Sequence, residues 1–213
     1  MSSRLVIVGG GGFGREVHAW VSSSPRWCAA HRIQEIVSID DSVPNVEMPV
    51  PIISTISGFQ PMESDIGICA IGSPVTRRGI VEQLESRGLV FPAFTHDTAT
   101  IGVNIALADG VIVCPMAILS CDIVVERHSH INCGCTVGHD VTIGEFTTLS
   151  SSCNLTGAVS VGSDSFLGTA VTVIPGVSLG AESYVGAGSV VVRNVAEGAR
   201  VFGNPALRIG GSS

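Results

Sequence analysis

The sequence predicts an α/β domain built on a parallel βαβ unit over residues 1–92, followed by an all-β parallel β-helix over residues 93–213. Two patterns predict this division. Residues 4–90 alternate short aliphatic runs with a glycine-rich loop and helical segments, and from Ile101 onward an aliphatic residue recurs at every sixth position. The composition agrees, because 45% apolar residues, 14% charged residues and 26 glycines fit packed strands joined by tight turns and exclude a disordered chain.

Charge and segment lengths exclude several classes of function. The chain has 11 basic and 18 acidic residues without a basic run, so we expect no nucleic-acid partner. No apolar stretch approaches the ~18 residues of a membrane span, and the Leu5–Val8 run begins too early for a signal peptide. Seven cysteines at irregular spacings do not indicate a disulfide framework. We therefore expect a cytoplasmic protein that does not bind membranes.

The N-terminal segment predicts three strands and two helices. The strands are expected at residues 5–8, 36–39 and 66–71, each followed by a loop. One helix follows the first loop, and a second runs from Pro74 to about Arg87. On this second helix we expect Val81 to face the core and Arg77 to face solvent. Strand, glycine loop, helix and strand in this order form a βαβ unit.

The glycine loop is the first candidate binding site. Gly9, Gly11 and Gly14 match G-x-G-x-x-G between a strand and a helix, where bare glycines let backbone N–H groups approach a phosphate. The alternative is a tight turn that needs glycine for packing alone. Asp40 and Asp41 follow the second strand, where they could accept hydrogen bonds from ligand hydroxyls or cap a turn.

The six-residue period predicts the C-terminal fold. All sixteen positions at six-residue intervals from Ile101 to Val191 are Ile, Leu or Val. The fourth residue after each of them is small or aliphatic. A period of six fits neither an α-helix nor an alternating strand. It fits a coil of short flat strands that each place one large and one small residue inward.

Histidines supply the candidate chemistry of the repeat. His139 occupies an outward position beside Asp140, where a carboxylate can orient an imidazole that acts as general base; the alternative is a surface histidine with a routine neighbour. His128-x-His130 raises a zinc site of the prism-shaped carbonic anhydrase type. For this pair we expect the two side chains to point to opposite faces, and therefore no metal. A third alternative is an inactive prism that serves assembly alone.

These motifs resemble known families. The repeat resembles the hexapeptide-repeat family, a left-handed β-helix with three hexapeptides per coil, in which residues 18 apart stack; Cys135 and Cys153 would then be buried neighbours with free thiols. The whole chain resembles the bacterial sugar O-acyltransferase family related to the sialic acid O-acetyltransferase NeuD, with a Rossmann-like N-terminal domain. The resemblance rests on Gly9–Gly14, Ser38–Asp41, Ala70–Gly72, Ile131–Asp140 and Gly203–Ala206.

The resemblance implies an acetyl-CoA-dependent acetyltransferase of surface-polysaccharide or glycan biosynthesis. The favoured acceptor is the 4-amino group of a nucleotide-linked amino-dideoxy sugar, and the alternative is O-acetylation of sialic acid or another sugar. It implies that His139 is the base, that Asp140 tunes it, and that a backbone N–H near Gly157 stabilises the oxyanion. It also implies a homotrimer with CoA held between adjacent prisms.

The resemblance further assigns binding residues. For CoA they are Thr148, Gly168, Thr169, Gly186, Ala187 and Arg208, the last of which could equally be a solvated terminal arginine. For the nucleotide-sugar acceptor they are Gly11, Gly12, Phe13, Asp40, Asp41 and Gly72. Phe13 replaces a histidine that is common in the glycine loop of the family.

Overall fold

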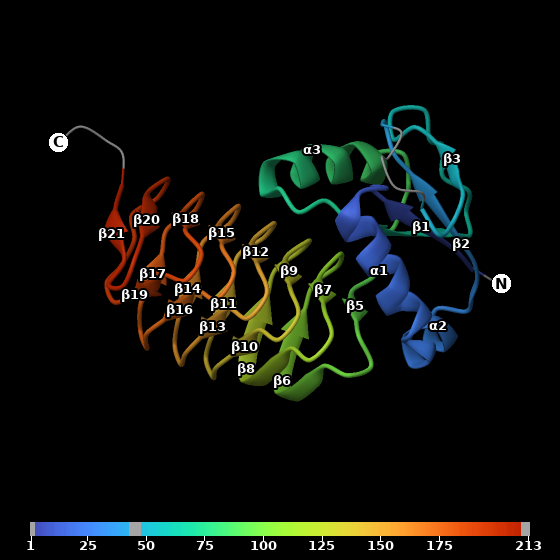
Figure 1. The fold of residues 1–213 in the computed structure, drawn as a ribbon. Helices are drawn as coiled ribbons and strands as arrows, with labels where there is room; N and C mark the ends of the chain where they lie inside the picture. The colour runs from blue at the N-terminus through green and yellow to red at the C-terminus, as the bar shows by residue number, and fades with distance from the viewer. Residues whose placement is uncertain (1–2, 43–47, 210–213) are drawn as a thin grey trace. The chain divides into compact units, whose positions relative to one another are not determined.

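The computed structural model describes residues 3–42 and 48–209, and the chain forms two compact units, Met1–Asp97 and Thr98–Ser213 (Figure 1). The first unit holds a parallel βαβ sheet and the second a parallel β-solenoid, so the predicted fold class is confirmed. The sequence placed the division between residues 92 and 93, whereas the two units meet in the chain between Asp97 and Thr98.

The first unit is built on a four-stranded parallel sheet in the order β3-β2-β1-β4. Its strands are β1 (Ser3–Val8), β2 (Ile33–Ile39), β3 (Ile52–Ser54) and β4 (Asp65–Cys69), and β5 (Phe94–Thr95) follows near the end of the unit. The side chains of Leu5–Val8 are fully buried, as expected of the strand paired on both sides. The sequence missed β3, a three-residue edge strand whose isoleucines are more than a third exposed.

Three helices complete the first unit: α1 (Gly12–Ser22), α2 (Pro25–Ala30) and α3 (Pro74–Glu85). Pro74 begins α3, and the Ser73 hydroxyl caps it by accepting a hydrogen bond from the Thr76 N–H. The expectation for Arg77 was wrong, because its side chain is fully buried and its guanidinium donates to the Ile71 carbonyl at 2.8 Å. Arg77 lies one turn before Val81, on the buried stripe of the helix.

The second unit is a solenoid in which residues 18 apart are paired. Its strands are β6 (Thr100–Leu107), β7 (Ile112–Val113), β8 (Ile118–Val125), β9 (His130–Ile131), β10 (Thr136–Val137), β11 (Thr142–Ile143), β12 (Thr148–Leu149), β13 (Asn154–Leu155), β14 (Ser160–Val161), β15 (Phe166–Leu167), β16 (Thr172–Val173), β17 (Ser178–Leu179), β18 (Tyr184–Val185), β19 (Val190–Val191), β20 (Arg200–Phe202) and β21 (Leu207–Arg208).

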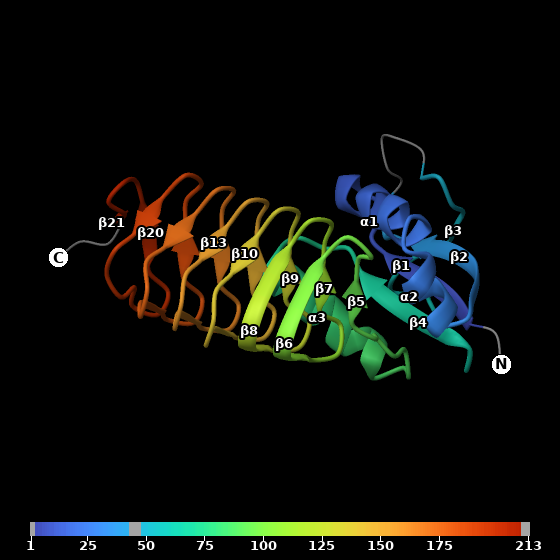
Figure 2. The same cartoon turned by 90° about the horizontal axis from the view of Figure 1, so that it is seen from below.

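The strands stack in three faces. One face carries β8, β10, β13, β16 and β19, of which the first three follow one another in Figure 2, and a second carries β11, β14 and β17. The long strand β8 joins these two faces, because its first part pairs with β10 and its last part with β11. The third face runs through β7, β9, β12, β15, β18 and β20, with β21 antiparallel beside β20.

The inward ladder matches the predicted period. Every sixth residue from Val113 to Val191 is at most 3% exposed, whereas Ile101, at the start of the run, is 40% exposed because it lies in the first coil. Cys135 and Cys153 occupy the small inward positions, are fully buried and remain free thiols, as predicted. Burial of aliphatic side chains between stacked coils is the main stabilisation of such a solenoid.

A left-handed backbone conformation recurs once per hexapeptide. From Asn104 to Gly188 every sixth residue has φ between 54° and 73°. These are turn positions, and four of them are glycines. The chain therefore makes the same turn at each corner of the coil. Side chains at one corner stack on those 18 residues later in the sequence. Within the described part of the chain, no helix is long and apolar enough to span a bilayer.

Candidate functional site

The carboxyl ends of the parallel strands form one candidate site. The chain passes from β1 to β2 and β3 on one side and then returns to β4 on the other side of β1. Such a reversal of strand order is where open α/β sheets bind ligands. The loops at this edge are Gly9–Gly14 after β1, Asp40–Ser42 after β2 and Ala70–Ser73 after β4. The sequence therefore identified three loops that the fold brings to one edge.

The glycines of this edge fall into two groups. A Cβ on Gly14 would lie 2.0 Å from the Gly9 carbonyl oxygen, and Gly9 itself has φ +109°, so both are required by the turn. A Cβ on Gly11 or Gly72 would meet nothing within 4 Å, and one on Gly12 would lie 3.8 Å from the Arg15 guanidinium. The tight-turn interpretation therefore explains Gly9 and Gly14 but not the other three.

The start of α1 presents backbone donors at this edge. Gly11 is its N-cap and, as a glycine, supplies no side-chain capping bond. Uncapped N–H groups and the helix dipole together favour an anion. Phe13 lies in this first turn, half-buried, with its ring edge-on to Trp20 at 5.8 Å.

Asp40 holds the glycine loop to the end of β2. Its carboxylate accepts hydrogen bonds from the Gly10 N–H and, at 2.7 Å each, from the N–H and hydroxyl of Ser42. Partial burial opposes ionisation, but these three bonds outweigh it and hold the pKa of Asp40 below its usual value. Asp41 is exposed and accepts weaker bonds from the N–H and hydroxyl of Ser57, at 3.2 and 3.4 Å.

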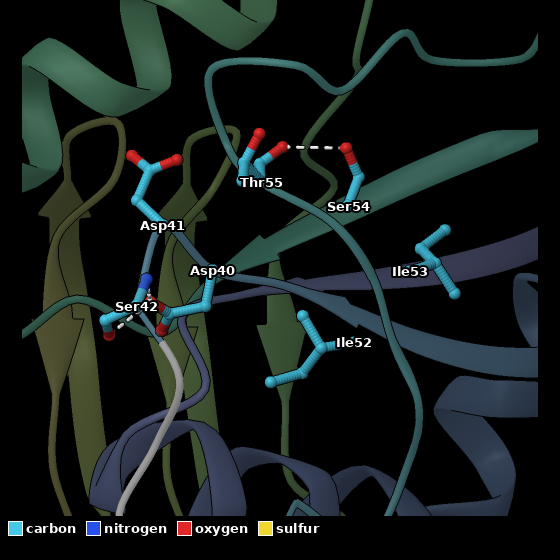
Figure 3. Close-up of a pocket in the computed structure, with 7 residues that line it drawn as sticks. All are labelled: Asp40, Asp41, Ser42, Ile52, Ile53, Ser54 and Thr55. Atoms are coloured by element: carbon cyan, nitrogen blue, oxygen red, sulfur yellow. Dashed lines mark hydrogen bonds between the residues drawn. The ribbon is translucent and has the colours of Figure 1, made fainter.

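A pocket of about 410 Å³ opens beside these aspartates (Figure 3). It is lined by Asp40, Asp41, Ser42, Ile52, Ile53, Ser54 and Thr55. The isoleucines lie on one side, and the carboxylate of Asp41 lies with Thr55 on another. An apolar wall with a few polar groups is typical of small-molecule sites, and the volume falls within their usual range. Sequence reasoning missed the β3 contribution, which the Ile52–Thr55 pattern of two aliphatic residues before two hydroxyls could have indicated.

A second candidate site lies at the solenoid corner between β10 and β11. The His139 Nδ1 lies 2.7 Å from the Asp140 carboxylate, and both side chains are 64% exposed. The other ring nitrogen, Nε2, lies over Gly157 in the next coil, where an added Cβ would approach it to 2.4 Å. Asp140 thus orients the imidazole, and glycine at 157 makes room for it.

The coil before His139 adds two residues that sequence reasoning missed. Asp122 occupies the turn position 18 residues before Asp140, and its carboxylate accepts a hydrogen bond of 2.9 Å from the Asn104 side chain a further 18 residues back. The Asp140 N–H donates to the Cys121 carbonyl at 3.2 Å, which fixes the two turns against each other. Counting back in steps of 18 from Asp140, the predicted partner of the base, would have found both residues.

The residues predicted to bind CoA divide by exposure. Thr169, Ala187 and Arg208 are exposed, whereas Thr148, Gly168 and Gly186 are buried. The Phe202 ring covers Gly186, and the backbone of Ala187 fills the space beside Gly168. Thr169 and Ala187 stack at the corner after the third face, whereas His139 lies at the corner between the first and second faces. One chain therefore does not bring these groups to a single corner.

The histidine pair of the zinc alternative lies inside the structure. The side chains of His128 and His130 are at most 1% exposed, and the His128 ring stacks on Phe146 at 5.1 Å. Among residues 3–42 and 48–209 no three His, Cys, Asp or Glu side chains gather closely enough to hold a metal ion.

Comparison with known proteins finds similarity in sequence over the N-terminal unit and in structure over nearly the whole chain. Residues 4–84 match the family model described as the PglD N-terminal domain, and no curated protein matches the chain. The acetyltransferase domain of PglB from Neisseria gonorrhoeae superimposes with a TM-score of 0.90 at 26% identity, over 98% of this chain and 100% of that one. PerB from Caulobacter crescentus, solved with CoA and GDP-perosamine, superimposes with a TM-score of 0.82 at 29% identity, over 98% of each chain. WeeI from Acinetobacter baumannii, at 24% identity and a TM-score of 0.88 over 98% of this chain and 100% of that one, shares the fold.

Proposed function

We propose that this chain, which carries a PglD-type N-terminal domain before the solenoid of the hexapeptide acetyltransferases, transfers the acetyl group of acetyl-CoA to the amino group of a nucleotide-linked amino sugar. The observation that carries the proposal is the His139–Asp140 pair, exposed at a solenoid corner with Nε2 open to a substrate. The neighbours of known structure include an acetyltransferase domain at 26% identity and a perosamine N-acetyltransferase at 28% identity, each over 98% of this chain. The product would enter glycan or surface-polysaccharide synthesis in the cytoplasm.

The proposed reaction is a direct transfer. The acceptor nitrogen attacks the thioester carbonyl carbon while His139 Nε2 takes a proton from that nitrogen. The tetrahedral intermediate then collapses, the carbon–sulfur bond breaks, and the thiolate of CoA leaves and is protonated. Asp140 keeps the proton of the neutral imidazole on Nδ1, so that the lone pair is on Nε2.

Gly157 is the proposed oxyanion donor. Its N–H makes no hydrogen bond among the described residues, and it lies in the same corner as the imidazole, since a Cβ on Gly138 would approach the Gly157 nitrogen to 2.9 Å. A preorganised backbone donor at such a position stabilises the negative charge that develops on the carbonyl oxygen.

We assign the acceptor to the edge of the N-terminal sheet. Gly11, Gly12 and Gly72 leave open space, and the first turn of α1 offers donors to the diphosphate. Phe13 borders this loop. Asp41, with free accepting capacity at the pocket, is the better candidate for ligand hydroxyls, whereas Asp40 is largely engaged by the loop itself.

We assign CoA to a groove between adjacent prisms of a homotrimer. Thr169 and Ala187 line one corner and His139 another, so a shared site needs two copies of the chain. Arg208, exposed on β21, is the candidate partner of a CoA phosphate. The buried Thr148, Gly168 and Gly186 would shape the groove through the backbone.

The decisive experiment mixes two impaired variants. We expect both His139→Asn and the groove-filling Ala187→Trp to release thiol from acetyl-CoA far more slowly than the wild type with a nucleotide 4-amino sugar. Co-expressed with different tags and purified as mixed oligomers, they should recover activity, because one interface then combines an intact His139 with an intact groove. Absence of recovery contradicts a shared site. Thiol release with sialic acid but with no amino sugar would favour the O-acetyltransferase alternative.

A further inference from the structure

We propose that Asp122 is a positioning residue for His139: a second carboxylate, one coil before Asp140, that stabilises the imidazolium formed when Nε2 takes the acceptor proton. The proposal rests on the role of His139 as the base. It concerns a residue outside the His139–Asp140 motif, and it arises from the stacking of three equivalent turns.

The turns that carry Asn104, Asp122 and Asp140 have the same backbone conformation. Their φ values are 56°, 56° and 59°, and the residues are spaced by 18, the length of one coil. Cys121 and Asp122 are therefore equivalent by position to His139 and Asp140 in the coil that follows. A hydrogen bond from the Asp140 N–H to the Cys121 carbonyl joins the backbones of these two turns directly.

The Asp122 carboxylate is held in place as an anion. Asn104 donates to it from the coil before at 2.9 Å. The Asn104 bond and the neighbouring Cys121 thiol lower the pKa of Asp122 most, desolvation opposes them, and the nearby charge of His139 adds a smaller lowering effect. Asp122 is consequently ionised throughout the range in which an imidazole titrates.

The charge of Asp122 acts on a sparsely charged corner. His139 contacts Asp140 of its own turn, and Cys121 and Asp122 occupy the equivalent positions of the turn before. The turn after it carries Gly157 and Ala158, which have no charge. Among the described residues no arginine pairs with Asp122 or Asp140. Two carboxylates therefore stabilise the imidazolium: Asp140 through a hydrogen bond, and Asp122 through its charge across space.

The test is the NMR titration of the His139 ring protons, assigned with the His139→Asn variant. Asn tolerates the left-handed conformation at position 122, so Asp122→Asn removes the charge without straining the turn. We expect the His139 midpoint to fall by about half a pH unit at low ionic strength and by less in 1 M salt. Asn104→Gly, which frees the Asp122 side chain, should produce a smaller fall.

Asp164→Asn is the matched control, because Asp164 has φ 57° at a different corner. It should leave the His139 midpoint unchanged. An unchanged midpoint in Asp122→Asn overturns the proposal, and so does an equal change in Asp164→Asn. The titration needs no turnover, so it separates this proposal from the proposed function. If the midpoint shifts but the acidic limb of the activity profile does not follow it, then His139 is not the base and Asp122 has no part in catalysis.

Discussion

The two units use glycine for opposite purposes. In the solenoid, the space where a Cβ would stand is filled by the backbone of the next coil, at 2.5 Å beside Gly144, 2.3 Å beside Gly162 and 2.4 Å beside Gly180. In the N-terminal loop, the corresponding space at Gly11 is open. Glycine spacing alone does not separate these cases. A glycine that no neighbour requires is a better indication of a ligand than the motif that contains it.

Gly157 belongs to a second group of solenoid glycines, whose space is filled by a ring rather than by backbone. The His139 imidazole fills it at Gly157, as the His128 imidazole does at Gly110 and the Phe202 ring at Gly186. The His139 side chain is 64% exposed and carries the proposed chemistry, so substitutions can separate glycines that serve packing from glycines that serve the site.

The largest effect is expected from His139→Asn, which keeps the size of the side chain but cannot accept a proton near neutral pH. General-base help contributes ~10²–10⁴-fold, so kcat/KM should fall by about that factor. Because the side chain is exposed, the melting temperature should not change. Thiol release and calorimetric titration with CoA measure the two effects separately. Near-full activity in this variant would mean that proximity of the substrates, rather than a base, supplies the rate.

The pair Gly157→Ala and Gly162→Ala compares a glycine covered by a ring with one covered by backbone. A Cβ at 157 meets the end of the His139 side chain, which can turn away, so we expect a native melting temperature and a loss of activity of about 10²-fold from misplacement of the base. A Cβ at 162 meets the Ala181 backbone at 2.3 Å, which cannot yield, so we expect destabilisation by about 1–3 kcal/mol. Equal effects on stability would remove the distinction between the two glycines.

The same contrast applies inside the glycine loop. Gly14→Ala places a Cβ 2.0 Å from the Gly9 carbonyl and should destabilise the N-terminal unit by about 1–3 kcal/mol in urea unfolding. The Cβ of Gly11→Val meets no protein atom within 4 Å, so we expect stability to hold while the acceptor KM rises by about tenfold and the affinity for acetyl-CoA stays the same. A parallel loss of affinity for both substrates would show that the loop has no specific role for the acceptor.

The solenoid was easier to predict from sequence than the first unit, because the same pattern of an inward aliphatic residue recurs in every hexapeptide. One inward residue in six is enough to place every strand from β7 to β19, and the exposed Ile101 marks where stacking begins. Arg77 was misplaced because its charge was given more weight than its helical position. The edge strand β3 was missed because three residues carry too little pattern.

The candidate site was predictable where it coincided with motifs and not where it depended on stacking. His139 and Asp140 are adjacent in the chain, so their 2.7 Å contact follows from local sequence. Asn104 and Asp122 reach the same corner only through the 18-residue coil. Likewise, the burial of Gly186 depends on Phe202, which no local pattern at Gly186 reveals.

The smallest effect is expected at Asp40. Here the glycine loop is held by hydrogen bonds to a charged side chain, rather than by the absence of a side chain as at Gly14. The pKa of Asp40 is depressed in the folded protein, so its hydrogen bonds stabilise the fold above the ordinary carboxyl pKa of ~3.9, and this stabilisation is lost as the pH falls through the folded-state pKa. Asp40→Asn should therefore unfold slightly earlier in urea than the wild type at pH 7, and the two curves should converge as the pH is lowered below about 4. Asp41→Asn, which alters the exposed neighbour, is the control and should show a smaller gap at pH 7. A gap between wild type and Asp40→Asn that widens in acid would show that the carboxylate does not hold the loop, and that Gly9 and Gly14 fix its conformation by sterics alone.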